Sequence, residues 1–381
     1  MRILLVGEYS RLHNSLKEGL TQLGHKVVII GTGDAFKKYP VDVNIESVFF
    51  KSGLPLFIKR VLYKLFNFDL RGIEQGLRFY TSVRKLGNFD IVQLINEEAI
   101  DSTPKMEILL LKFLSKRTKK MFLLSCGTDH VSVSFANAKK VRYSILTPFF
   151  NGDDPDKSSY NFVFKYLEKP YVRLHQFLYK NVNGVIATDL DYHIPLLGNP
   201  KYIGMIPNPI NCEKLASTPF KIQQKIRIFH GINSGNYYRK GNYLFEEALR
   251  IVLEKKPNNI EVISTRDLPY DVYIKEYNNC HICLDQVYGF DQGYNALEAM
   301  AKGKVVFTGA ESEFLEYYHL EKNEVCINAL PNAKSMAAEL EALIENPNKI
   351  LEISKNARAF IQREHHYIQI AEKYVAKWNE Y

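Results

Sequence analysis

The chain has 381 residues, enough for two hydrophobic cores, and its 46% hydrophobic and 24% charged residues indicate a globular rather than a disordered protein. No apolar run approaches the roughly 20 residues of a membrane-spanning helix, and residues 3–6 are too short an apolar run for a signal peptide, so we expect a cytoplasmic protein. The formal net charge of +8 leaves an anionic partner open.

Short apolar runs alternate with helical patterns through the first half of the chain. An amphipathic helix is predicted at 13–23, ending at Gly24. Strands are predicted at 2–6, 26–30, 90–95, 121–125 and 184–187. This alternation is typical of a parallel sheet covered by helices on both faces.

The segment Pro207-Asn208-Pro209 interrupts this pattern, because two prolines fit neither a helix nor a central strand. The alternation then restarts. Further strands are predicted at 226–230, 259–263, 281–285 and 305–307, and helices at 242–254, 270–278 and 294–302. The α/β sequence therefore predicts two doubly wound, Rossmann-like domains, 1–205 and 206–362, facing each other across a ligand-binding cleft.

A C-terminal helix is predicted for residues 363–381. It is expected to pack on either of the two domains, and the N-terminal domain is one candidate. One apolar face is built by residues spaced as on a helix: Tyr367, Ala371, Tyr374 and Trp378. The adjacent His365 and His366 point in different directions, so we expect no shared metal.

A basic segment spans residues 51–87, with eight Lys and Arg residues against two acidic ones and with leucine and phenylalanine interleaved. A second basic cluster lies at 112–120. Such stretches bind anionic lipid headgroups or nucleic acid, and a helix with a solvated basic face gives the same pattern. We expect no nucleic-acid partner, because no recognised nucleic-acid module occurs. An anionic membrane surface and a merely solvated face both stay open.

Cys280 and Cys283 have the spacing of a zinc or redox pair. A second such pair is missing, and the intervening residues are typical of a buried strand, so we expect a structural role. The odd total of five cysteines suits a reducing compartment. The first strand–turn, residues 6–11, lacks the glycines of a dinucleotide loop, which disfavours an NAD-dependent dehydrogenase.

A loop that follows the predicted strand 226–230 begins at Gly231 and carries Arg239 and Lys240 directly before a helix. Gly231 lets the backbone approach a ligand closely. Cations beside the partly positive start of a helix are the combination that binds a diphosphate. The alternative is a surface basic pair without a binding role.

A second predicted helix starts at Gly293, so N–H groups of its first turn, around Tyr294 and Asn295, are left to donate to a ligand. Glu298 lies inside this otherwise apolar helix. Because an unpaired buried carboxylate is costly, it either forms a structural salt bridge or accepts two neighbouring hydroxyls such as those of a ribose.

Three motifs occur together in order: Pro207-Asn208-Pro209, Arg239-Lys240-Gly241, and Leu297-Glu298-Ala299-Met300-Ala301 followed by Gly303. With Gly24-His25 and Gly127-Thr128-Asp129 in the first half, the set resembles the retaining GT-B glycosyltransferases of family 4. The resemblance spans nearly the whole chain and is strongest over 203–318.

The resemblance implies an enzyme that transfers a sugar from a nucleotide-diphosphate-sugar to an acceptor hydroxyl with retention. Its donor site would lie in 206–362 and its acceptor site in 1–205. Lys240 and Arg239 would hold the diphosphate, and Glu298 would bind the ribose. Gly293, with its neighbours Tyr294 and Asn295, would face the donor's phosphate or sugar, and Asp129 would face the cleft from the acceptor domain. The resemblance implies no metal and no other cofactor.

One position departs from the family pattern: Phe290 stands where the family has a glutamate that contacts the donor sugar. Asp291, or Asp285 with Gln286, could take its place. The acceptor is expected to be a glycan or a lipid-linked glycan in cell-surface polysaccharide assembly, met in the cytoplasm or on the inner face of the membrane. The alternatives are a non-catalytic, membrane-binding protein and a nucleotide-sugar epimerase on the same fold.

Overall fold

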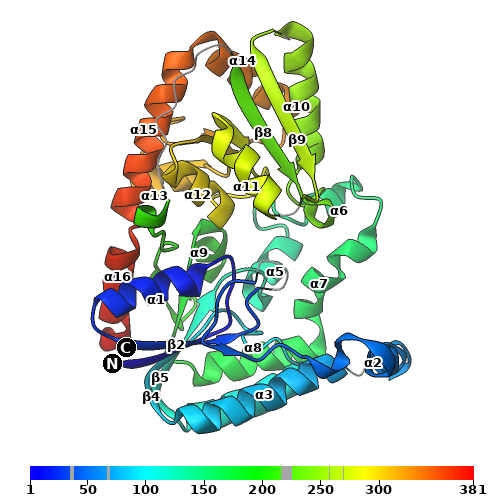
Figure 1. Cartoon of the computed structure of the whole chain (residues 1–381), viewed down its shortest axis with the longest axis vertical. Coiled ribbons are helices and arrows are strands. Elements are labelled where there is room, and N and C mark those ends of the chain that lie inside the picture. The colour runs from blue at the N-terminus through cyan, green and yellow to red at the C-terminus, as the bar shows by residue number, and fades with distance from the viewer. Residues whose placement is uncertain (35–37, 67–68, 216–224, 257, 269) are drawn as a thin grey trace.

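Two parallel β-sheets, one in each half of the chain, organise the protein (Figure 1). The computed structural model describes residues 1–34, 38–66, 69–215, 225–256, 258–268 and 270–381. Residues 67–68 of the basic segment and residues 216–224 of the predicted second domain therefore lie outside the described part. Within the described residues, no helix is long and apolar enough to cross a lipid bilayer.

The first sheet has seven strands in the order β3-β2-β1-β4-β5-β6-β7, all parallel. Its strands are β1 (Arg2–Val6), β2 (Lys26–Gly31), β3 (Val43–Asn44), β4 (Phe89–Leu94), β5 (Thr118–Ser125), β6 (Gly184–Ala187) and β7 (Tyr202–Met205). The central strand β1 is apolar from Ile3 to Val6 and fully buried, because sheet neighbours and covering helices leave it no solvent-facing side. The five strands predicted in this half are confirmed.

The helices of the first half lie on both faces of this sheet (Figure 1). They are α1 (Leu12–Gln22), α2 (Gly53–Phe66), α3 (Leu70–Leu86), α4 (Pro104–Ser115), α5 (His130–Asn137), α6 (Thr147–Asn151), α7 (Asn161–Phe164), α8 (Lys169–Asn181) and α9 (Leu190–Leu196). Helix α4 packs between α3 and α8 on one face, and α1 covers β2 on the other.

The second sheet has five parallel strands in the order β12-β11-β10-β8-β9. These are β8 (Ile226–Ile232), β9 (Ile260–Arg266), β10 (Ile282–Leu284), β11 (Val305–Thr308) and β12 (Ile327–Asn328). The helices around them are α10 (Asn242–Lys255), α11 (Tyr270–Asn279), α12 (Tyr294–Ala301), α13 (Ser312–Tyr318), α14 (Ala333–Glu345) and α15 (Pro347–Glu364). The strands and helices predicted in this half are confirmed to within a few residues.

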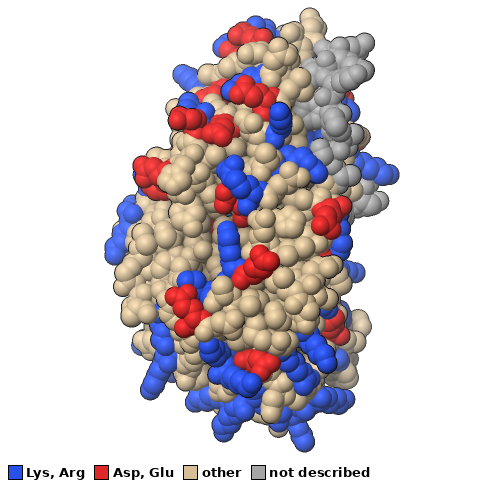
Figure 2. Space-filling view, turned by 90° about the vertical axis from the view of Figure 1, so that its left-hand side faces the viewer, with Lys and Arg blue, Asp and Glu red and all other residues tan. Residues whose placement is uncertain are grey.

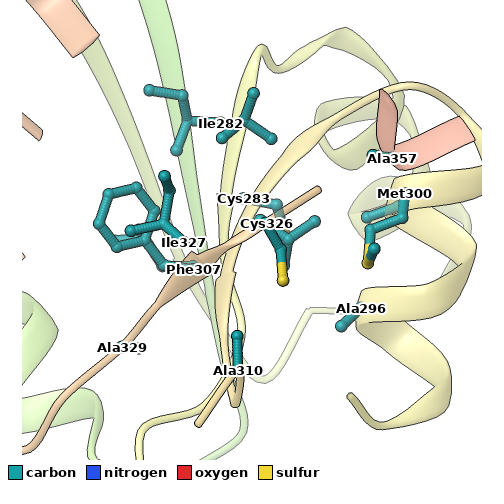
Figure 3. Close-up of a cluster of buried hydrophobic side chains, with 14 of the residues drawn as sticks. Ile282, Cys283, Ala296, Met300, Phe307, Ala310, Cys326, Ile327, Ala329 and Ala357 are labelled. Atoms are coloured by element: carbon teal, nitrogen blue, oxygen red, sulfur yellow. The ribbon is translucent and has the colours of Figure 1, made fainter. Parts of the chain in front are cut away.

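Figure 3 shows part of the core of the second half: Ile282 of β10 and Phe307 of β11 lie on one side of the sheet, and Cys283 of β10 lies on the side of Ala296 and Met300 of α12. Cys280 and Cys283 are both buried and free of disulfides. Burial raises the pKa of the Cys280 thiol to about 11. No metal-binding group of His, Cys, Asp or Glu occurs among the described residues. Both thiols are part of the buried core of the second half, as expected for residues at a buried strand.

The chain crosses between the two halves at two places that lie side by side. Ile210 donates its N–H to the carbonyl of His365 at 2.7 Å, and Tyr367 donates its N–H back to the carbonyl of Ile210 at 3.3 Å. Beyond this point α16 (Tyr367–Glu380) returns to the first half and packs along α1 (Figure 1). The helix is anchored at its end by Trp378, which is fully buried and donates to Gln93 at 3.2 Å.

The contact between α1 and α16 depends on Gly19, because a Cβ there would lie 2.3 Å from the carbonyl oxygen of Tyr367 and 2.8 Å from the Cβ of Ala371. In a helix without tertiary contacts, Gly to Ala would stabilise by about 1 kcal/mol. We predict that Gly19→Ala instead lowers the free energy of unfolding by about 1–3 kcal/mol, the cost of overpacking. Chemical denaturation measures this, with Gln22→Ala on the exposed side of α1 as the control. A stabilised Gly19→Ala protein would contradict this packing.

Candidate active site

The order of strands reverses between β8 and β10, so the loops that leave these two strands diverge at their carboxyl ends, the position where open α/β sheets bind ligands, which we call the crevice. Lys240 ends the loop after β8, directly before Gly241 and α10. Gly241 has a φ of 72°, and a Cβ there would lie 2.7 Å from Val287, so the sharp turn after Lys240 requires glycine. This turn places the Lys240 side chain at the crevice.

Lys240 meets Asp285, the first residue after β10. The Lys240 Nζ lies 2.9 Å from Asp285 Oδ1. The Asp285 side chain is 1% exposed, whereas that of Lys240 is 32% exposed. Asn295, in the first turn of α12, donates its Nδ2 hydrogen to the same carboxylate oxygen at 2.9 Å. We call Lys240, Asp285 and Asn295 the switch-point cluster.

The start of α12 lies beside this cluster. Gly293 caps the helix with an extended backbone, and the first N–H groups of any helix lack an intrahelical acceptor. Tyr294 turns towards the crossover and donates its hydroxyl to the carbonyl of Pro209 at 2.8 Å. Burial raises the pKa of Tyr294 well above its usual value, and the nearby carboxylates of Glu8 and Glu298 add to the rise. Tyr294 thus lies near Glu8, in the loop after β1, and near Glu298, which is half-buried one turn further along α12.

Arg239 does not share the position of its neighbour Lys240. Its guanidinium donates to the carbonyl of Ser159 at 3.0 Å and to Asn236 Oδ1 at 2.7 Å. It also lies 4.6 Å from the ring centroid of Phe162, a cation–π distance. Ser159 and Phe162 belong to a segment of the first half, residues 138–168, that reaches across to the second half (Figure 1). In this structure, the Arg239 side chain contacts that segment and does not point to Asp285, the partner of Lys240.

The same segment makes further contacts with the second half. Arg142 forms ion pairs with Glu311 at 2.8 Å and Glu313 at 2.7 Å, and the Tyr243 hydroxyl donates to Asp153 at 3.0 Å. These contacts close one side of the space between the two halves.

Two of the predicted site residues serve the fold where they stand. A Cβ at Gly231 would lie 2.5 Å from the ring of Tyr273, so the close packing of that ring in the second half favours glycine there. Asp129 is buried and caps α5: its Oδ1 accepts from the N–H of Ser132 at 2.7 Å, and its Oδ2 accepts from the hydroxyl of Ser125. Neither observation assigns these residues to a ligand.

Asp291 lies in the interface between the two halves. Its Oδ2 accepts the N–H of Leu190, at the start of α9, at 3.2 Å. Reciprocally, the carboxylate of Asp191 in α9 accepts the N–H of Phe290 at 3.0 Å. With the buried Asp189, three carboxyl groups meet here, and burial raises the pKa of each, that of Asp291 to about 6. Asp291 thus joins the two halves, which leaves Asp285 as the predicted substitute that faces Lys240.

A cavity of about 210 Å³ opens next to these carboxyl groups. The first half contributes Thr128, Ser132 and Asp191 together with an apolar wall from 141–146, and the second half contributes Gln286 and Gly293. Because Gly293 borders both the cavity and the start of α12, the cavity adjoins the switch-point cluster from the side of the first half.

Asp189 and Asp191 were not predicted as site residues from the sequence. A signal was available, since both lie within four residues of the end of the predicted strand 184–187, and polar residues at the carboxyl end of a parallel strand indicate a functional or interface position.

The comparisons with known proteins agree with this architecture. The family described as "Glycosyl transferase-like" matches residues 239–376, less than half of the chain. Among curated proteins, no sequence matches. In solved structures, HepE from Anabaena, in complex with UDP and glucose, aligns over 100% of both chains with a TM-score of 0.61 at 13% identity.

Sucrose-phosphate synthase from Thermosynechococcus elongatus aligns over 100% of this chain and 98% of its own, with a TM-score of 0.63 at 13% identity. A putative UDP-N-acetylglucosamine 2-epimerase from Listeria monocytogenes aligns over 98% and 94%, with a TM-score of 0.54 at 11% identity. At these identities the likeness concerns the fold. This chain has the GT-B architecture of two Rossmann-like halves, as predicted.

The buried carboxyl of Asp291 predicts a pH dependence of stability. Its pKa of about 6 in the folded protein exceeds the usual 3.8, so the folded state binds more protons. Its contribution to stability is therefore present at low pH and lost as the pH rises through about 6. We predict that between pH 5 and pH 7.5 the wild type loses on the order of 1 kcal/mol more stability than Asp291→Asn.

Thermal unfolding across this pH range measures the difference. Asp156→Asn, at an exposed carboxylate whose pKa is lowered by hydrogen bonds from Ser158, is the control and should follow the wild type. Parallel pH profiles for Asp291→Asn and wild type would contradict a protonated interface carboxyl.

Proposed function

We propose that this chain is a glycosyltransferase that moves a sugar from a nucleotide-diphosphate-sugar to an acceptor hydroxyl. The observation that carries the proposal is the switch-point cluster, where Lys240 meets the start of α12 at the carboxyl ends of β8 and β10. A cation and unpaired helix N–H groups together offer a diphosphate both charge and directed hydrogen bonds. The partial match of residues 239–376 to a glycosyltransferase-like family supports the same reading.

In the proposed mechanism the donor diphosphate binds the exposed part of the Lys240 ammonium group. It either replaces the Asp285 carboxylate as the partner of Lys240 or binds Lys240 together with that carboxylate. The positive charge of Lys240 and the N–H groups after Gly293 would stabilise the diphosphate as it leaves with the bonding electrons. Glu298, one turn along α12, would accept the two ribose hydroxyls. Lys240 would do the work that a bound metal cation does in other transferases, so we propose no metal and no cofactor.

We further propose retention of the anomeric configuration, by attack of the acceptor hydroxyl on the face that the diphosphate leaves, as the resemblance to family 4 implies. Asp285 and Gln286 would take the place of the sugar-contacting glutamate that Phe290 replaces. The acceptor, a glycan or a lipid-linked glycan of cell-surface assembly, would enter through the cavity beside Gly293, close to Asp129. It would be met in the cytoplasm or on the inner face of the membrane.

An epimerase is the second candidate, because a putative 2-epimerase shares the fold over nearly the whole chain. The two activities differ in what they release without an acceptor. A transferase slowly hydrolyses its nucleotide-sugar and releases the nucleoside diphosphate. An epimerase that does not hydrolyse its substrate interconverts two nucleotide-sugars.

Lys240→Ala should lower the rate of nucleoside-diphosphate release from the preferred nucleotide-sugar by about 100- to 1,000-fold, the effect of removing one group that stabilises developing negative charge. The measurement screens UDP-, GDP- and ADP-sugars and then compares variants on the best donor. Lys322→Ala, at an exposed lysine of the second half, is the matched control and should keep the wild-type rate. A folded Lys240→Ala protein with nearly full activity would refute the assignment, and interconversion of sugars without release would establish the epimerase instead.

A further inference from the structure

The helix α2 carries apolar side chains that face solvent. Leu54 is 71% exposed, Phe57 64% and Leu65 66%. The preceding short 3-10 turn (Phe49–Lys51) adds Phe49, which is 66% exposed, next to the exposed Val48. We call residues 48–65 the α2 surface. Exposed large apolar residues occur singly on most proteins, but a contiguous group of them marks a binding surface.

The exposed apolar residues form one stripe. Leu54, Ile58 and Leu65 are separated by four and seven residues, so they lie on the same side of the helix, and all three are exposed. The helix contacts α3, and none of its described residues is fully buried. A surface helix of a globular protein normally turns its apolar stripe to the core, whereas α2 turns this stripe to solvent.

The cations of α2 itself have no acidic partner on the same helix. Residues 52–66, which include α2, contain Lys59, Arg60 and Lys64 but no Asp or Glu. Among the residues that the structure describes, no salt bridge is formed by these three. The other half of the basic segment differs, because Arg71 and Arg78 of α3 are paired with Asp101 and Glu74.

Helices α2 and α3 lie at the lower end of the molecule in Figure 1, with α2 at the right-hand side. Figure 2 views the molecule from the opposite side and shows Lys and Arg side chains gathered at the lower end of that face. At the C-terminal end of α3, Arg2 donates to the carbonyl of Leu86, and nearby Lys119 of β5 pairs with Asp90 at 2.7 Å. The β5 part of the second basic cluster therefore lies at the end of α3 that is remote from α2 (Figure 1), and the cations of the α2 surface are those of α2 itself.

We propose that the α2 surface docks this protein onto an anionic lipid bilayer. The stripe of Leu54, Ile58 and Leu65, together with the adjacent Phe57, enters the boundary between headgroups and acyl chains, and Arg60 and Lys64 contact lipid phosphates. This binding is independent of the donor site. A second copy is a poorer occupant, because a two-fold contact would bring the same uncompensated cations together from both chains.

The test is co-sedimentation of the full-length chain with vesicles of neutral phosphatidylcholine, and with vesicles that also contain phosphatidylglycerol. We expect binding to the anionic vesicles that weakens with added salt, because screening shortens the reach of the charges. The variant Leu54→Glu/Phe57→Glu/Leu65→Glu should bind at least tenfold more weakly. Because all three side chains are exposed, the variant should keep the wild-type melting temperature.

The matched control is Leu197→Glu/Leu351→Glu, which places acids at exposed leucines away from α2 and should bind like the wild type. Equal binding of the α2 variant and the control would overturn the proposal, as would equal binding to neutral and anionic vesicles. So would absence of vesicle binding together with a dimer, seen by light scattering, that the α2 variant converts to a monomer. That last result would assign the surface to self-association.

Discussion

A buried carboxylate and the cation that neutralises it organise the candidate site. Asp285 stands at the carboxyl end of β10 almost without exposure, a position that is tolerated because Lys240 and Asn295 both bind the same oxygen. Each of the three comes from a different element: the loop after β8, the end of β10 and the start of α12. The pair therefore fixes these elements relative to one another and keeps a cation at the crevice. In the proposed function, an entering diphosphate would meet a lysine that is already oriented and only one-third exposed.

The two halves are held across the crevice by a different kind of contact. Asp191 and Asp291 each accept a backbone N–H from the opposite half, and the segment 138–168 adds the ion pairs of Arg142. The buried carboxyls make the interface sensitive to protonation, while the crossover at Ile210 and His365 adds hydrogen bonds close to the chain's passage between the halves. These contacts between the two halves thus lie outside the switch-point cluster.

Much of the fold could be predicted because buried parallel strands are nearly continuous apolar runs, as in β1 and β11, and because prolines mark the crossover. The two-residue strand β3 is too short for any periodicity, and the segment 138–168 has no pattern beyond its polar loop. Arg239 and Lys240 are adjacent, yet their side chains contact different halves of the protein. The sequence does not show this difference, because it depends on the turn at Gly241 and on the position of the Phe162 ring in the folded protein. On α2 the periodicity is the same whether the stripe is buried or exposed, so only the structure shows that it faces solvent.

The most direct test of a nucleotide-sugar site is a thermal-shift titration with UDP, GDP, ADP and CMP, each at about a hundred times a micromolar-range Kd. Binding at that excess stabilises the folded state by roughly 2.7 kcal/mol. The account predicts stabilisation by one nucleoside diphosphate, lost in Glu298→Ala because the ribose hydroxyls then lack their acceptor. No stabilisation by any of the four nucleotides would contradict the donor site, and with it the proposal that this chain transfers a sugar.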